Sequence, residues 1–173
     1  KIMQPWLIAT SLALPACELA SKQSGQPVLD GLIGEKAKAE GKKLVGLETV
    51  GEQFSAMYKL PEDFHIAALK ETLKLGTVAE DIIETMKQLY LKGEIGIIQP
   101  LTKAVSPNTS QSESYEDFTT SLITDRNQVM AERSLPYLME GGAFVAVGAL
   151  HLPGKLGLVE KYREAGFTIT RAD

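Results

Sequence analysis

The sequence predicts a helix-rich α/β fold, with a small, mostly parallel sheet, flanking helices and a helical insertion. Segments with helical spacing of apolar residues alternate with short, continuous apolar runs, which are typical of buried parallel strands. Glycine and proline mark the ends of most of these segments. A chain of 173 residues with 44% hydrophobic residues can bury one core. We therefore expect a single domain over residues 1–173.

The first part of the chain predicts two helices and a strand. Residues 5–20 are moderately apolar, and Cys17, the only cysteine, is expected to be a small core residue. Residues 28–40 keep apolar side chains at helical spacing and end before Gly41, a residue type that commonly terminates helices. Residues 43–48 form a short apolar run, which predicts a buried strand.

A helical insertion with a loop is expected over residues 54–107. The pattern is helical from residue 52 to residue 93, with proline and acidic residues at one helix start. His65 follows these acidic residues and is expected at the surface. The polar stretch 100–114 predicts a mobile loop.

The last third predicts a long helix, a central strand, a short helix and a final strand. The long helix covers residues 115–139 and ends before two glycines. Residues 143–147 are all apolar, which predicts a strand in the middle of the sheet. A helix over residues 158–165 and a strand over residues 167–170 follow. This order of elements is typical of α/β layering.

Several classes of function are disfavoured by the composition and by missing motifs. The net charge of −4 arises from interspersed charges, so no nucleic-acid footprint is present. One cysteine excludes an internal disulfide framework and a cysteine-rich zinc site. The chain contains no P-loop, no GxGxxG after a strand, no GxSxG and no HExxH.

The segment after the expected central strand is the main candidate site. His151 follows that strand, at the edge where open α/β sheets place their ligand sites, and Gly148 and Gly154 allow unusual backbone angles around it. Glu48 holds the equivalent position after the strand over residues 43–48. An imidazole and a carboxylate at one sheet edge suit a metal ion or acid/base catalysis. A turn histidine and a solvated glutamate are the alternatives.

Three polar residues interrupt the apolar pattern of the long helix. Arg126 falls in phase with the stripe, and an inward arginine should meet a carboxylate, a substrate anion or backbone carbonyls. A structural ion pair and a role in the site are both open for it, as they are for Arg133. Asn127 also breaks the pattern and is a candidate substrate-binding residue. Gln53 is expected to bind the substrate or to hydrogen-bond Glu48.

Several segments together resemble the TraB/GumN family. They are Asp-Arg-Asn-Gln-Val-Met-Ala at 125–131, Gly-Ala-Phe-Val-Ala-Val-Gly-Ala-Leu-His-Leu-Pro-Gly at 142–154, the glycine-bounded segment 157–167, and upstream Leu-Asp at 29–30 and Leu-Glu-Thr at 47–49. The family typically has two GxxH motifs. Gly148 and His151 match the second motif, and the first has no counterpart before Asp30. We therefore expect the chain to lack the N-terminal part of the domain.

The resemblance implies a fold related to erythromycin esterases and ChaN-like haem-binding proteins, and a relation to the metal-dependent Tiki proteases. It implies a divalent metal ion (Mn, Co or Zn) bound by His151 and Glu48. Glu48, His151 and Arg126 are then the catalytic residues, with Arg126 as a clamp for the substrate or a carboxylate. A peptide or small-molecule substrate and a periplasmic, secreted or membrane-anchored location are implied as well.

Two alternatives to this hydrolase stay open. The same crevice can bind a ligand or peptide without turnover. The chain can also serve as a scaffold, in which case we expect its exposed sheet edges to pair with the missing N-terminal segment or with a second copy in a homodimer.

Overall fold

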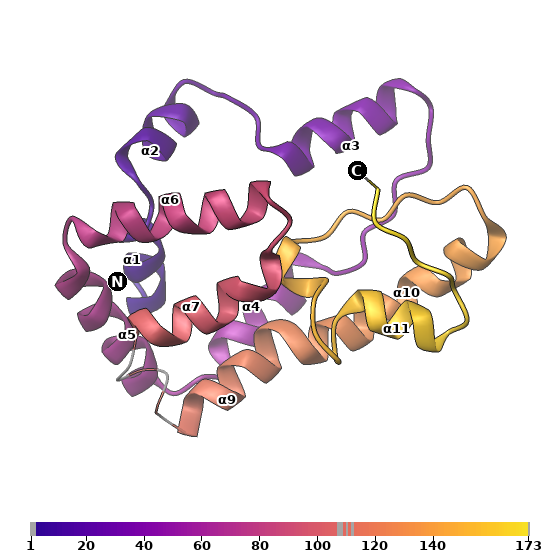
Figure 1. Ribbon diagram of the computed structural model, residues 1–173. Coiled ribbons are helices and arrows are strands. Elements are labelled where there is room, and N and C mark those ends of the chain that lie inside the picture. Colours follow the sequence, from indigo (N-terminus) through magenta and orange to yellow (C-terminus); the bar gives the residue numbers. More distant parts are fainter. Residues whose placement is uncertain (1–2, 107–108, 110, 112, 173) are drawn as a thin grey trace.

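Figure 1 shows the computed structural model, which describes residues 3–106, 109, 111 and 113–172. Within these residues the chain is built of helices joined by turns and irregular segments, and no strand occurs. The expected α/β fold with a parallel sheet is therefore wrong for this structure. The helices pack against one another in place of covering a sheet.

Helix bounds follow the local patterns of the sequence. The α-helices are α1 (Pro5–Leu12), α2 (Ala16–Gln23), α3 (Leu29–Ala39), α4 (Val50–Tyr58), α5 (Glu62–Leu75), α6 (Val78–Leu91), α7 (Ile98–Val105), α9 (Glu113–Thr119), α10 (Asp125–Glu140) and α11 (Leu158–Glu164). The described residues also contain the short 3-10 helices η1 (Ile95–Ile97) and η3 (Ala149–His151) and a π-helix, η2 (Thr120–Thr124).

The three expected strands are irregular segments in the structure. Residues 43–48, 143–147 and 167–170 make no ladder of backbone hydrogen bonds within the described residues. Phe144, expected at the centre of a sheet, is 79% exposed. A strand requires a partner that pairs with its backbone, and an apolar run alone cannot supply one. The apolar runs therefore predicted buried, paired strands, and the described residues contain no partner strand for them.

Other boundaries differ from the sequence expectations for local reasons. The expected helix over residues 5–20 is split into α1 and α2, because Pro15 cannot donate a backbone hydrogen bond and restricts the residue before it. Part of the expected loop 100–114 is helical in α7. The side chain of Cys17 lies outside the described part of the structure.

Two clusters of buried side chains hold the helices together. One joins Leu60 and Phe64, from the α4–α5 region, to Tyr115 of α9. The other joins Met130 and Ala131 of α10 to Leu158 of α11, which is completely buried, with Leu47, Val147 and Tyr162 packed against it. The second cluster fixes the start of α11 against the middle of α10, and the loop that carries His151 lies just before that start.

The loop between η3 and α11 is folded tightly over the N-terminus of α11. A Cβ atom at Gly157 would lie 2.3 Å from the carbonyl oxygen of Pro153 and 2.4 Å from that of Leu152. Both atoms belong to the backbone, so no side-chain rotation relieves the contact. Only glycine fits at this position without movement of the loop.

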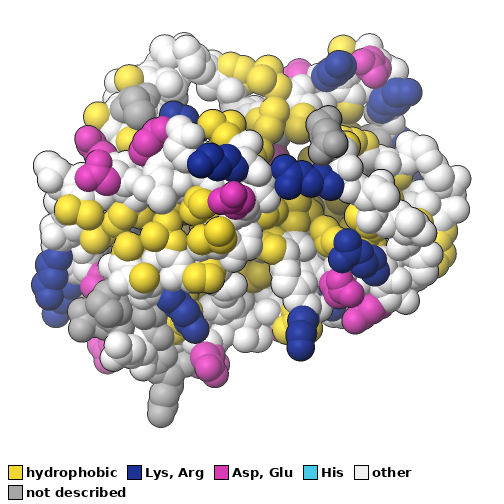
Figure 2. Space-filling model, in the orientation of Figure 1, with side chains coloured by type: hydrophobic (Ala, Val, Ile, Leu, Met, Phe, Trp, Pro, Cys, Tyr) yellow, Lys and Arg dark blue, Asp and Glu magenta, His cyan; other side chains and the backbone are white. Residues whose placement is uncertain are grey.

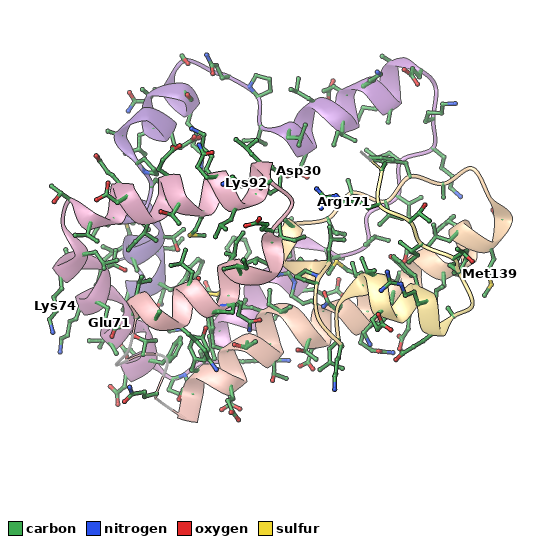
Figure 3. All side chains as sticks on the ribbon, in the orientation of Figure 1. Asp30, Glu71, Lys74, Lys92, Met139 and Arg171 are labelled. Atoms are coloured by element: carbon green, nitrogen blue, oxygen red, sulfur yellow. The ribbon has the colours of Figure 1, made fainter. Side chains whose placement is uncertain are left out.

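The C-terminal segment crosses back to the turn after α6. Arg171 donates from Nη2 to the carbonyl oxygen of Lys92 at 3.2 Å, and Figure 3 shows the two residues at neighbouring points of the ribbon. Because this contact lies at the surface, it ties the end of the chain to α6 without adding to either core.

Apolar side chains remain at the surface in many places. Figure 2 shows a band of hydrophobic side chains across the face formed by α6 and α7. On α3, Leu29 and Leu32 are 60% and 50% exposed. Within the described residues, no helix is both long and apolar enough to cross a bilayer.

We predict that Gly157→Ala destabilises the protein by roughly 1–3 kcal/mol, because the new Cβ overlaps two backbone carbonyls. Gly31→Ala is the matched control, since its Cβ would lie 3.9 Å from Val28 in ordinary contact within α3. The control should gain about 0.5–1 kcal/mol from reduced backbone freedom. Urea unfolding followed by circular dichroism measures both changes, and equal stability of the two variants would contradict the tight loop.

Candidate functional site

A nearly buried ion pair joins α10 to the segment before α4. Arg126 donates from Nε to Oε1 of Glu48 at 2.8 Å and from Nη2 to Oε2 at 2.7 Å. The glutamate side chain is 6% exposed and the arginine side chain 22% exposed. Nη1 of Arg126 also donates to the carbonyl oxygen of Leu122 at 3.0 Å. The carboxylate and carbonyl partners expected for an inward arginine are thus both present.

The end of the segment that carries Glu48 is fixed by a capping box at the start of α4. The backbone N–H of Glu52 donates to the Thr49 hydroxyl, and the backbone N–H of Thr49 donates to the Glu52 carboxylate. Arg133, one of the two arginines on the stripe, binds the same carboxylate at 2.6 and 2.9 Å and the carbonyl oxygen of Leu47 at 2.8 Å. Hydrogen bonds from Arg133 and then from Thr49 lower the pKa of Glu52 to about 2.

His151 is held by Asn127, whose side chain is 1% exposed. The amide Nδ2 of Asn127 donates to the carbonyl oxygen of Leu156 at 2.8 Å, and its Oδ1 lies 2.7 Å from Nδ1 of His151. A carbonyl oxygen accepts only, so Leu156 fixes which end of the amide faces the imidazole. Nδ1 of His151 must then carry the proton in this contact. The lone pair of the neutral ring is left on Nε2.

Nε2 of His151 has no hydrogen-bond partner within the described residues, and it is not completely buried. The histidine as a whole is 7% exposed. Burial first, and then the positive charge of Arg126, lower the pKa of His151 below its ordinary value, while Glu48 acts in the opposite direction. The ring is therefore neutral at pH 7, with an available lone pair.

The two glycines of the motif have different local roles. Gly148 precedes η3, its carbonyl accepts the backbone N–H of His151 at 2.9 Å, and a Cβ there would lie 3.5 Å from Cδ2 of the imidazole. Gly154 has a φ of 86°, which favours glycine, and it turns the chain after the histidine.

The structure brings four of the residues expected from the sequence into one region. Glu48 and Arg126 are in contact, Asn127 and His151 are in contact, and α10 carries a member of each pair. Gln53 is exposed, and within the described residues no side-chain hydrogen bond joins it to Glu48, because Arg126 takes both carboxylate oxygens.

His65, the other histidine, does not belong to this region and is not at the surface. It is 7% exposed, and its Nε2 lies 3.1 Å from the carbonyl oxygen of Met57. The sequence reasoning also missed the carbonyl of Leu156 and the Glu52–Arg133 pair. The capping box at Thr49 and Glu52 was the signal by which Glu52 could have been found, since its residue types and spacing are visible in the sequence.

His151 and Glu48 are the expected ligands of a divalent metal ion. A catalytic zinc ion usually takes three protein ligands. Within the described residues no group of three histidine, cysteine, aspartate or glutamate side chains is close enough to hold a metal ion. His151 offers one nitrogen, and the Glu48 carboxylate is taken up by Arg126. These residues therefore do not form a three-ligand metal site by themselves.

We predict that Arg126→Met destabilises the protein by about 3–5 kcal/mol, because it leaves the nearly buried Glu48 carboxylate without its partner. Arg133→Met removes the exposed pair with Glu52 and should cost far less. Chemical unfolding at pH 7 compares the two. Equal losses would mean that the Arg126 pair is no more buried in solution than the Arg133 pair.

We also predict that His151 titrates below 6.5 in the folded protein. Arg126→Met should raise this pKa and Glu48→Gln should lower it, since the two charges act in opposite directions. Proton NMR of the two histidine rings, assigned with His151→Gln, measures the values. A lowered pKa means that the stability contributed by neutral His151 is complete above pH 6.5 and is lost as the pH falls toward the folded-state pKa.

Comparison with known proteins gives one result. The chain matches the TraB/PrgY/gumN family over residues 1–171. No curated protein and no solved structure matches it. Because the match covers nearly the whole sequence, including the glycine and histidine motif at residues 148–151, this chain belongs to the TraB/PrgY/gumN family.

Proposed function

We propose that this chain carries a hydrolytic site for an amide or ester bond, centred on His151. The observation that carries the proposal is the state of its imidazole: Nδ1 is bound to Asn127, and Nε2 keeps a lone pair with no hydrogen-bond partner within the described residues. A general base needs a lone pair that a water molecule can reach and a second nitrogen that is held in place. Membership of the TraB/PrgY/gumN family is consistent with this use of the motif histidine.

In the proposed reaction, Nε2 of His151 accepts a proton from water while the water oxygen bonds to the carbonyl carbon of the substrate. The imidazolium then gives that proton to the leaving nitrogen or oxygen as its bond to carbon breaks. The Asn127 oxygen accepts a hydrogen bond from Nδ1–H throughout and keeps the ring oriented. Asn127 is almost inaccessible to solvent, and both polar atoms of its amide already make hydrogen bonds. We therefore assign it a positioning role in place of the substrate-binding role expected from the sequence.

Glu48 and Arg126 support this site through their charges and their pairing. The positive charge of Arg126 favours the neutral imidazole, which is the form that accepts a proton. Glu48 holds Arg126 through both carboxylate oxygens. In this arrangement the charges of the pair tune the pKa of His151, and His151 itself accepts and donates the proton.

A divalent metal ion (Mn, Co or Zn) on His151 is an alternative to the general-base reaction. A neutral Nε2 whose ring is held through Nδ1 is a common metal ligand. His151 would supply one ligand, and the described residues supply no set of three. A metal ion on Nε2 would occupy the lone pair that accepts the water proton in the proposed reaction, so His151 would then act as a ligand in place of a general base.

A binding protein without turnover is the second candidate. A cavity of about 400 Å³ is lined by residues on both sides of His151, namely Leu150, Pro153 and Gly154. Cavities of this size hold small molecules in many proteins without catalysis. Tight binding of a compound that is recovered unchanged would favour this candidate.

We predict that His151→Gln lowers hydrolysis of 4-nitrophenyl butyrate and of a fluorogenic peptide mixture by roughly 10²–10⁴-fold, since it removes the proton acceptor. Lys155→Ala, a change at an exposed residue of the same loop, is the control and should keep full activity. Each protein is assayed with EDTA and with added Mn, Co or Zn, and calorimetry with each metal alone measures binding. Equal activity of His151→Gln and the control under all conditions would overturn the proposal.

A further inference from the structure

A cavity of about 400 Å³ lies between α7, the junction of α9 with η2, and the loop that contains η3. Figure 1 shows α7 and α9 as neighbouring helices, with η2 continuing from α9 into α10. The walls come from segments far apart in the sequence, so the cavity exists only because the helices pack in this way. Its volume is in the range of small-molecule sites.

The lining of the cavity is apolar and uncharged. Phe118, Leu122 and Ile123 form the wall from α9 and η2, and Ile95 faces the cavity from η1. The polar groups in the wall are amides and hydroxyls, and no lining residue is acidic or basic. Burial raises the pKa of the Tyr115 phenol, so this group stays neutral as well. A charged group entering the cavity would lose its hydration without gaining a partner of opposite charge.

The cavity adjoins the candidate site through two residues. Leu150, which precedes His151, lines the cavity and is 38% exposed. Leu122 lines the cavity, and its backbone carbonyl accepts a hydrogen bond from Arg126. It belongs to a π-helix, a feature found frequently at functional sites. A group held in the cavity thus lies next to the residues that orient and tune His151.

We propose that this cavity binds a neutral apolar group of the substrate beside His151. This proposal rests on the proposed function, because it assigns the apolar group to a substrate. Binding of an apolar group in the cavity does not depend on that function. Either a fatty acyl chain or an apolar amino-acid side chain carries this chemistry. A lysine, arginine, aspartate or glutamate side chain does not.

The test uses N-phenyl-1-naphthylamine, a neutral apolar dye whose fluorescence increases on binding. Gly96 lines the cavity, and a Cβ built there meets no atom within 4 Å. Gly96→Leu therefore fills the cavity without a backbone clash and should weaken dye binding at least tenfold. Gly31→Leu, a glycine-to-leucine change in α3, is the control and should leave dye affinity unchanged. Leu150→Asp, at a partly exposed position, places a charge at the wall and should also weaken binding.

Competition against the dye distinguishes the two sources of the apolar group. Displacement by octan-1-ol supports an acyl chain, and displacement by N-acetylphenylalaninamide supports an apolar side chain. Displacement by N-acetyllysinamide at equal concentration overturns the proposal, as does equal dye affinity of the unchanged protein and Gly96→Leu. His151→Gln should bind the dye normally while losing hydrolysis, so failure of the cavity and failure of the hydrolytic site give different results.

Discussion

The bidentate contact between Arg126 and Glu48 determines the arrangement of the candidate site. It joins residues 78 positions apart, and the glutamate side chain is almost removed from water. A carboxylate in this position is tolerated because a planar guanidinium meets both of its oxygens. The contact draws the segment before α4 onto α10, and it sets a positive and a negative charge near His151. Burial and Arg126 together outweigh Glu48, and the net effect is a neutral imidazole.

Helix α10 is the element through which the other contacts are organised. Arg126 faces Glu48, Asn127 faces His151, and Met130 with Ala131 packs against Leu158. Packing at Leu158 places the start of α11, and the tight turn at Gly157 then limits where the preceding loop can run. The Leu156 carbonyl in that loop orients the Asn127 amide. The fold and the tautomer of His151 thus depend on the same short stretch of chain.

The helices could be predicted from the sequence because their evidence is local: apolar spacing, capping residues and glycine at positions such as Gly41 and Gly141, both of which have positive φ. The irregular form of residues 143–147 could not be predicted, because strand pairing is a property of two segments and an apolar run shows only one of them. At the site, the inward phase of Arg126 predicted a buried partner without identifying Glu48 as that partner. The role of Asn127 required the Leu156 carbonyl, which no pattern of side chains reveals.

The π-helix at residues 120–124 connects the ion pair with the cavity. Asp125, Arg126 and Asn127 follow it directly, so the wider turn of η2 sets the rotation at which α10 begins. The same turn directs Leu122 and Ile123 into the cavity wall, while the carbonyl of Leu122 accepts from Arg126. A shift of η2 would therefore move the cavity wall and the guanidinium together.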